Sequence, residues 1–263
     1  MKTAKPFLEQ RRERRGLLRA GLGLAAGGVL GGCDALSHNE TAVEILRSAE
    51  ALNGSLHRVI GRRAMAQEFA ASEIAPVFRA NGTTMPPGTD YAALVSSGFA
   101  GWTLTVDGLV DKPLELKMAA LQAMPARTQI TRHDCVEGWS CIGQWKGVRL
   151  SHLLSLAGVK SQARFVVFHC LDQMEEDDED TAYYESIDLD DALHEQTILA
   201  WELNGKPLPV ENGAPLRARI ERQLGYKQPK YLYRVELVDS FATLGGGKGG
   251  YWEDQGYNWY GGI

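Results

Sequence analysis

The chain has 263 residues, of which 44% are hydrophobic and 23% are charged, and its net charge is −5 at pH 7. Residues 1–32 hold seven of the 28 basic and two of the 33 acidic residues, which leaves 21 basic against 31 acidic residues and a net charge of −10 for the remainder. That acidity argues against a nucleic-acid partner, because nucleic-acid-binding proteins neutralise phosphates with clustered lysine and arginine. The remainder, about 230 residues, is long enough for one sizeable α+β domain.

Residues 1–33 are predicted to be a targeting signal. The pair Arg14-Arg15 is followed by two leucines and a third arginine, which is typical of a twin-arginine export signal. A general secretory signal with a spare arginine pair is the alternative. The uncharged stretch 20–32 is too short and too rich in glycine for a transmembrane helix, which needs about 20 apolar residues. It ends at Cys33 in a pattern that resembles a lipoprotein cleavage site, so we expect a periplasmic protein anchored there by lipid, and Asp34 favours the inner membrane.

Residues 34–98 are predicted to form a helical annex that ends in a loop. Apolar residues at helical spacing predict a helix over 41–52. Asn53-Gly54 is expected to end that helix, and a second helical segment is expected over 56–69. A stretch rich in glycine and proline at 81–88 is interpreted as a loop.

Residues 99–263 are predicted to form the main domain. Apolar and alternating runs predict strands over residues 102–106, 128–133, 164–170, 198–202 and 231–238. Helical spacing predicts a helix over 148–157 and one helical turn over 190–194. The six acidic residues at 175–180 are interpreted as a solvated loop rather than a metal site. The aromatic, glycine-rich stretch from residue 245 is expected to pack as an ordered loop.

Three cysteines follow Cys33 in the sequence, and Cys135 has the most polar surroundings. It lies in the run His-Asp-Cys-Val-Glu at 133–137, whereas structural cysteines mostly lie in apolar runs. An odd number of thiols in an oxidising compartment leaves at least one outside an intramolecular disulfide. Cys135 is therefore a candidate metal ligand or nucleophile, with a disulfide to Cys141 or Cys170 as the third interpretation. Cys141 and Cys170 are interpreted as structural, and a bond between them would leave Cys135 free.

Five blocks of the sequence carry a resemblance to a known family, and they span roughly residues 76–241. The blocks lie at 102–108, at 135–140 with 145–148, at 203–209, at 212–217 and at 225–231. Together they resemble the sulfite oxidase family of molybdopterin oxidoreductases, and within it the periplasmic methionine sulfoxide reductase catalytic subunits. The resemblance implies an α+β fold, in which a sulfite-oxidase-type molybdopterin-binding domain of mixed β-sheets and short helices follows a helical N-terminal segment.

The resemblance also implies a cofactor, a single molybdenum–molybdopterin of the mono-pyranopterin type. The metal's thiolate ligand falls on Cys135, and a soft thiolate suits a metal in a sulfur-rich shell. The terminal phosphate of the pterin requires cations and polar donors. The implied cofactor-binding residues are Asn81, Cys135, Cys170, Asn212, Arg217, Lys227, Gln228 and Lys230. Cys170 departs from the family pattern, because the reductases have a threonine there. The candidates for the catalytic pocket beside Cys135 are Arg132, His133 and Tyr226.

The implied activity is oxygen-atom transfer coupled to a separate electron-transfer partner. The substrate would be a small oxyanion, a sulfoxide or a related oxo compound, and sulfite-like oxidation and sulfoxide-like reduction both fit. The sequence has no Cys-x-x-Cys-His haem motif, so we expect electrons to pass through a c-type cytochrome or a membrane haem protein. The sequence stops soon after the matched region, where full sulfite oxidases continue into a dimerisation domain, so a monomer is expected.

Three other interpretations stay open. The run 131–136 also resembles the Ser/Thr-His-Gly-Cys run of L,D-transpeptidases, which would make Cys135 the nucleophile of an envelope acyl transferase, although Asp134 replaces the glycine. A zinc site would have to use His133, Cys135, His169 and Cys170, whose spacing fits no standard zinc module. A binding lipoprotein on the same scaffold, without cofactor, is the third.

Overall fold

The computed structural model describes residues 38–61, 64–174 and 182–263. The predicted signal at 1–33 and the acidic run at 175–180 lie outside the described residues. The chain divides into two compact units, residues 1–60 and 61–263, and each is described by itself. The predicted boundaries after residues 33 and 98 stay predictions.

The first unit contains α2 (Glu40–Gly61), the longest helix of the described residues. It begins after Asn39, whose side-chain Oδ1 accepts a hydrogen bond from the Ala42 amide at 3.0 Å. The helix runs through Asn53-Gly54, where the sequence predicted a break, because one internal glycine costs a helix only about 1 kcal/mol. Within the residues that the structure describes, no helix combines the length and the apolarity required to cross a bilayer.

The predicted helix over 56–69 does not extend past Gly61. From residue 64 the chain instead runs along two strands of the second unit, β3 (Ala126–Cys135) and β4 (Trp139–Arg149), and its backbone amides bond to those strands. The Phe69 amide donates to the Ile130 carbonyl at 2.9 Å, and the Ala75 amide donates to the Ile142 carbonyl at 3.0 Å. These tertiary hydrogen bonds replace the ones that a helix would make within itself.

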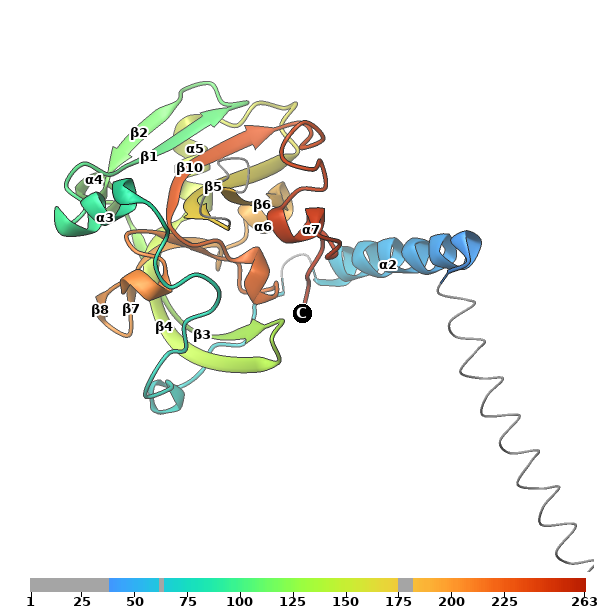
Figure 1. Ribbon diagram of the computed structural model, residues 1–263, viewed down its shortest axis with the longest axis horizontal. Helices are drawn as coiled ribbons and strands as arrows, with labels where there is room; N and C mark the ends of the chain where they lie inside the picture. Colours follow the sequence, from blue (N-terminus) through green and yellow to red (C-terminus); the bar gives the residue numbers. More distant parts are fainter. Residues whose placement is uncertain (1–37, 62–63, 175–181) are drawn as a thin grey trace, which may run out of the picture. The chain divides into compact units, whose positions relative to one another are not determined.

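The second unit is built on two sheets, which lie one above the other in Figure 1. The first has the order β2-β1-β10-β5-β6, and the second has the order β3-β4-β7-β8 with β9 paired to β7. The strands are β1 (Thr103–Gly108), β2 (Leu114–Lys117), β3 (Ala126–Cys135), β4 (Trp139–Arg149), β5 (Phe165–Gln173), β6 (Ala182–Asp188), β7 (Ile198–Leu203), β8 (Lys206–Pro207), β9 (Arg217–Arg219) and β10 (Leu232–Val238). Only the pair β1–β10 is parallel among the described strands.

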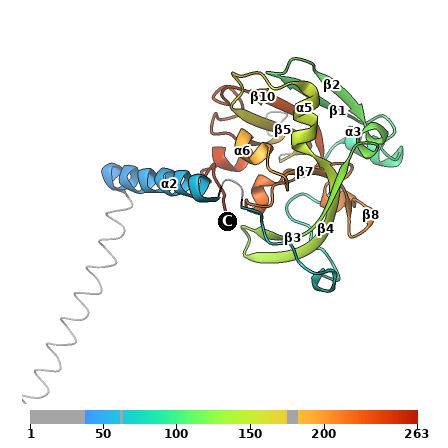
Figure 2. The same cartoon turned by 180° about the vertical axis from the view of Figure 1, so that it is seen from behind.

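The helices of the second unit are short. They are η1 (Ala71–Glu73), α3 (Thr89–Ser96), α4 (Met118–Gln122), α5 (Leu150–Ala157), α6 (Leu189–Ala192), η3 (Val210–Asn212), η4 (Gly225–Lys227) and α7 (Tyr251–Asp254). In Figure 2, α5 lies against the long strand β4, and among its residues Leu150, Leu153, Leu154 and Ala157 are buried. The five predicted strands and the helix over 148–157 are confirmed, with ends shifted by a few residues. The main domain therefore has the predicted mixed sheets and short helices.

The β3–β4 hairpin positions Cys135. In β3 every second side chain is buried on one face, and this face carries Gln129, Thr131, His133 and Cys135. The hairpin turn follows immediately: Cys135 pairs with Trp139, and the Gly138 amide donates to the Cys135 carbonyl at 3.0 Å. Gly138 has φ 85°, which a glycine adopts without strain. The thiol thus sits at the tip of a rigid hairpin.

Candidate functional site

A pocket opens where the tip of this hairpin meets the loop before β10. It encloses about 750 Å³ of empty space, counted with its open mouth. Its walls come from five parts of the second unit that lie far apart in the sequence. They are residues 81–83, the hairpin tip 135–137, the end of β5 and the start of β6 with Asp172, Met174 and Tyr183, the loop with Gly225, Tyr226, Gln228, Pro229 and Lys230, and Trp252 and Tyr257 near the C-terminus.

Cys135 lines this pocket with only 9% of its surface exposed. Burial raises the pKa of its thiol, and the Glu137 carboxylate acts in the same direction. The backbone amides of Glu137 and Val136 hydrogen-bond to the thiol and lower its pKa, as does the Arg79 guanidinium. The thiol therefore stays protonated in the empty protein, while the amides around it are placed to stabilise a thiolate that a metal would bind.

Arg217, on β9, is a buried cation next to the loop that carries Gln228. Arg217 is fully buried, and its Nη1 and Nη2 donate to the carbonyl oxygens of Asn212 and Gln228 at 2.9 and 3.1 Å. Its guanidinium lies over the Trp145 ring, 5.0 Å from the centroid. Burial and then the neighbouring Arg219 lower the pKa of Arg217 to about 9. Such a cation is destabilised until an anion approaches it.

Lys230 supplies the cation on the pocket wall itself. Its Nζ donates to the carbonyl oxygens of Asn81 at 2.6 Å and Glu211 at 3.2 Å, and also to that of Thr83. Burial and then Arg217 lower the pKa of Lys230 to about 7. The Lys230 side chain packs closely against the backbone of Gly213, where a Cβ would lie only 2.8 Å from the Lys230 Cβ.

Several buried polar atoms in this region have no hydrogen-bond partner among the described residues. They are Asn81 Oδ1, Asp172 Oδ1, Gln228 Oε1, Asn212 Nδ2 and Arg217 Nε. Leaving a buried polar atom unpaired costs about 1–3 kcal/mol, so five such atoms in one region indicate a ligand that completes them. Two are donors, on the Asn212 amide and the Arg217 guanidinium, which fits a phosphate. Three are acceptors on residues of the pocket lining, which fits ring N–H groups. With the Cys135 thiol, this set matches a phosphorylated pterin that carries a soft metal.

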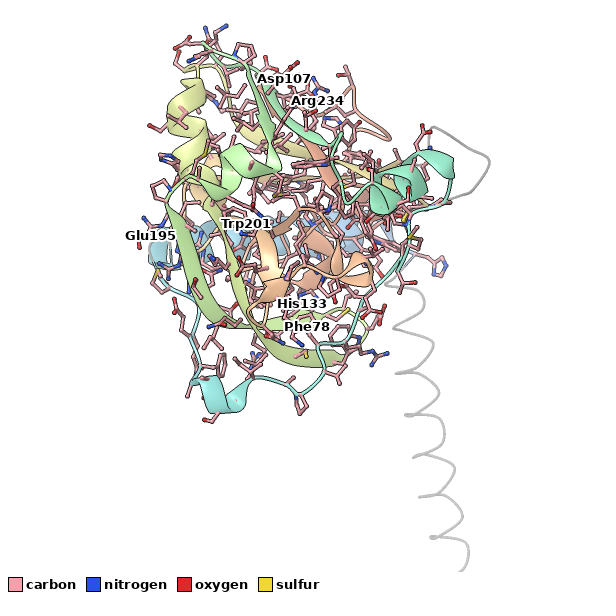
Figure 3. The ribbon with its side chains drawn as sticks, turned by 90° about the vertical axis from the view of Figure 1, so that its left-hand side faces the viewer. Phe78, Asp107, His133, Glu195, Trp201 and Arg234 are labelled. Atoms are coloured by element: carbon pink, nitrogen blue, oxygen red, sulfur yellow. The ribbon has the colours of Figure 1, made fainter. Side chains whose placement is uncertain are left out.

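His133 lies behind the pocket wall and does not line it. Arg219 Nη1 lies 3.0 Å from His133 Nδ1, and because a guanidinium can only donate, Nδ1 is the acceptor and the neutral ring carries its hydrogen on Nε2. Burial, then Arg219 and Arg217, hold the pKa of His133 well below 6.5. The ring edge reaches Gly225, where a Cβ would lie 2.5 Å from Nε2. Figure 3 shows His133 beside Phe78, and the two ring centroids lie 6.0 Å apart. His133 thus supports the wall at Gly225.

Two other sequence candidates are buried away from the pocket lining. Lys227 is fully buried and binds two carboxylates, Glu185 and Glu253, the latter at 2.5 Å. Its ammonium charge is therefore paired within the protein. Cys170 packs in the main hydrophobic core, and burial raises the pKa of its thiol well above 9.0. The described pocket lining therefore includes neither of these side chains. It also lacks Asn212 and Arg217, and Arg217 reaches the lining only through its bond to the Gln228 carbonyl.

Arg132 points away from the site, contrary to its place among the pocket candidates. It precedes His133 in β3, so the two-residue period of the strand turns it to the opposite face. Its side chain is 53% exposed and pairs with Asp134 at 2.9 Å. Tyr226, in contrast, lines the pocket as predicted, and its hydroxyl donates to the Asn258 carbonyl at 2.8 Å.

Asp172 is a wall residue that sequence reasoning missed. It is buried, and burial raises its pKa to about 6, against the opposing influence of Lys230 and of a hydrogen bond from Thr83. A carboxylate at the end of the apolar run 165–171 was the available signal. Trp252 and Tyr257 were also missed, because their stretch was expected only to pack as a loop.

The other interpretations of Cys135 find no support in the geometry. The three described cysteines, Cys135, Cys141 and Cys170, are all free, so no disulfide joins them. No group of three His, Cys, Asp or Glu side chains within the described ranges could hold a metal such as zinc. The thiol also lacks the activation that a nucleophile requires, since burial raises its pKa and the His133 imidazole is engaged with Arg219.

Comparisons with known proteins agree with this geometry. Residues 92–243 match the family described as oxidoreductase molybdopterin binding domain. Over 255 residues the chain is 35% identical to a protein of Azospira oryzae, provisionally named protein-methionine-sulfoxide reductase subunit YedZ1, a match that covers 95% of this chain and 87% of the relative.

Shorter matches reach two further proteins. The chain is 34% identical over 145 residues to the protein-methionine-sulfoxide reductase catalytic subunit MsrP of Campylobacter jejuni, which covers 52% of this chain and 49% of that protein. This match therefore spans only about half of MsrP. Among solved structures, the sulfane dehydrogenase SoxCD of Paracoccus pantotrophus is 23% identical with a TM-score of 0.46, over 53% of this chain and 38% of that one.

Proposed function

Because this chain belongs to the family of oxidoreductases with a molybdopterin-binding domain, the sulfite oxidase family that its sequence resembles, we propose that it reduces sulfoxides by oxygen-atom transfer. Its cofactor is molybdenum–molybdopterin, and it is an oxidoreductase. The observation that carries the proposal is the group of unpartnered buried polar atoms beside the pocket of Cys135. Two relatives are named as methionine-sulfoxide reductase subunits, which supports the direction of the reaction.

The residues divide the work of holding the cofactor. Cys135 would bind molybdenum through its thiolate, which the Val136 and Glu137 amides stabilise. Arg217 and Asn212, whose Nε and Nδ2 are unpartnered, would bind the phosphate. When bound, the cofactor supplies a centre that exchanges one oxygen atom and two electrons with the substrate. The protein's own contribution is to orient that centre in the pocket.

The charge of the pocket favours a neutral substrate. Lys230 is the one cation on the described lining, and three carbonyl oxygens already occupy its Nζ. A sulfite-like dianion requires several cations or guanidinium groups, and the described lining has no arginine. A sulfoxide carries no net charge, and its reduction, R₂SO + 2H⁺ + 2e⁻ → R₂S + H₂O, balances with two electrons from a donor protein.

Location and partner belong to the same proposal. The arginine pair at 14–15 and the cysteine at position 33 support twin-arginine export to the periplasm and a lipid anchor on the inner membrane. The electrons would come from a separate c-type cytochrome or membrane haem protein. The net charge of −10 after the signal would favour docking of a basic donor.

A substrate screen tests this function. The protein is expressed with its own signal in a host that makes molybdopterin, and the purified protein is assayed with a reduced dye as electron donor. We expect turnover with sulfoxides and at least tenfold lower kcat/KM for sulfite oxidation with an oxidised dye. A protein that contains molybdenum but oxidises sulfite faster than it reduces any sulfoxide would overturn the proposed direction.

A further inference from the structure

The stretch 245–263, here called the aromatic strap, folds back over the second unit and lies outside the family match at 92–243. It is fastened at both ends. Gly250 forms a β-bridge with Glu185 in β6, and Gly262 forms one with Gln223. Figure 1 shows α7 of the strap beside β6, and the Leu224 amide donates to the Gly261 carbonyl at 2.8 Å. The strap is therefore a fixed part of the domain.

The strap supplies an aromatic wall to the pocket. Trp252 and Tyr257 both line it, with their ring centroids 5.3 Å apart. Tyr257 also meets Tyr226 edge to face at 5.3 Å, and the Tyr226 hydroxyl is tied to the strap at Asn258. Tyr257 is 39% exposed, which places it between the pocket and solvent. One side of the pocket is thus a continuous aromatic surface that the matched family region alone does not contain.

The rest of the lining carries sulfur and polar groups, so its chemistry differs from that of the strap. Cys135 lies on the hairpin tip and Lys230 lies in the loop before β10, while the strap contributes two aromatic rings. The two carboxylates on the lining, Asp172 and Glu137, further disfavour an anionic substrate. The Trp139 indole donates to the Glu137 carboxylate at 2.8 Å, and neither carboxylate offers apolar surface to a substrate, so the rings are the contact for an apolar group.

We propose that Trp252 and Tyr257 bind the apolar substituent of the sulfoxide. They would set a preference for sulfoxides with an aryl or long alkyl substituent over dimethyl sulfoxide. The proposal rests on the proposed function and names the part of the substrate that the strap recognises. Rings bind such arms by removing apolar surface from water and by contact with sulfur. The larger arm of a sulfoxide would lie on the strap while its oxygen faces the Cys135 side of the pocket.

The test compares two sulfoxides on the holoenzyme. For Trp252→Ala and Tyr257→Ala we expect KM for methyl phenyl sulfoxide to rise about tenfold, because about 50 Å² of apolar contact is lost. The kcat values, and KM for dimethyl sulfoxide, should stay within about twofold. Tyr233→Ala is the matched control, because Tyr233 on β10 is 38% exposed, like Tyr257, but lies outside the pocket lining. Trp252→Phe, which keeps a ring, should restore most of the affinity. Equal changes for both sulfoxides, or none, would overturn the proposal.

A binding measurement separates this proposal from the function itself. Methyl phenyl sulfone, used as a probe that need not react, should quench tryptophan fluorescence of the wild type and the Tyr233→Ala variant. The Trp252→Ala variant, shown to be folded by an unchanged melting temperature, should bind the sulfone about tenfold more weakly when binding is measured by titration calorimetry. If the wild type binds the sulfone in this way but reduces no sulfoxide, the proposed function fails while the aromatic wall stands. If Trp252→Ala binds the sulfone as the wild type does, the wall proposal fails.

Discussion

Arg217 and Arg219 lie two residues apart on β9, both fully buried, yet the stability of the protein should respond differently to their substitution by methionine. Arg219 donates to the Glu221 carboxylate through Nε at 3.0 Å and Nη2 at 2.6 Å. Arg217 donates to two backbone carbonyl oxygens at 2.9 and 3.1 Å, and within the described part of the chain no carboxylate forms an ion pair with it. Arg219 is therefore a structural cation, while Arg217 is placed for an external anion.

The magnitudes follow from these partners. The lowering of the Arg217 pKa from 12.5 to about 9 corresponds to about 5 kcal/mol against its charged form. Arg217→Met removes that cost and leaves two carbonyl oxygens unpaired, at about 1–3 kcal/mol each. The free energy of unfolding of the cofactor-free protein should therefore lie between about 1 kcal/mol below and about 3 kcal/mol above that of the wild type. Arg219→Met leaves Glu221 buried without its partner and should cost about 3–5 kcal/mol.

Two assays check the contrast. Urea denaturation of protein made in a host without molybdopterin gives the two stabilities, and elemental analysis of protein made with the cofactor gives the molybdenum content. Arg217→Met should retain its stability but lose at least about tenfold in molybdenum content, because the phosphate loses a charge-assisted contact. If Arg217→Met instead loads molybdenum normally, or destabilises the cofactor-free protein as much as Arg219→Met does, the assignment of Arg217 to the cofactor is wrong.

Three other changes test separate parts of the site. Asp172→Asn should stabilise the cofactor-free protein by up to about 3 kcal/mol above pH 6 and have no such effect near pH 4. Burial raises the pKa of Asp172 from 3.8 to about 6 in the folded state, so the wild type loses stability as the pH rises between these two values. The asparagine cannot ionise and avoids that loss. Urea midpoints of both proteins, measured from pH 4 to 8, test this pH dependence. Gly225→Ala should cost about 1–3 kcal/mol, because its Cβ meets the buried His133 ring at 2.5 Å, whereas Gly101→Ala, with no atom within 4 Å, should not. Equal urea midpoints for these two alanine variants would contradict the packing of His133. Cys135→Ser should abolish turnover and the thiolate-to-molybdenum absorption while far-ultraviolet circular dichroism stays unchanged, and persistent absorption would exclude Cys135 as the ligand.

Local pattern was enough to find the hairpin and its thiol. The alternation over 128–133 predicted β3, and the polar neighbours of Cys135 marked it for chemistry at the end of that strand. The same alternation also places Arg132 on the opposite face from Cys135, and applying the two-residue period would have excluded it. Secondary structure is thus predictable here where one face of a strand is buried.

Long-range partners could not be predicted from the sequence. The resemblance implied that Lys227 binds the cofactor, but Glu185 and Glu253, 42 and 26 residues away, bind it in the interior. Trp252 and Tyr257 reach the pocket only because the strap folds back onto β6. Likewise, the backbone amides of residues 69 and 75 donate to carbonyl oxygens of β3 and β4 instead of to carbonyl oxygens within a helix. These bonds depend on tertiary contacts, which local sequence does not predict.

The central claim is that Cys135, together with the unpartnered groups around its pocket, holds molybdenum–molybdopterin. The most direct measurement is the molybdenum and pterin content of the purified protein, expressed with its signal in a host that makes the cofactor. We predict about one molybdenum and one pterin per chain for the wild type, since the pocket has a single thiol. Less than about a tenth of an equivalent of each, in a preparation where a known molybdopterin enzyme is fully loaded, would contradict the account.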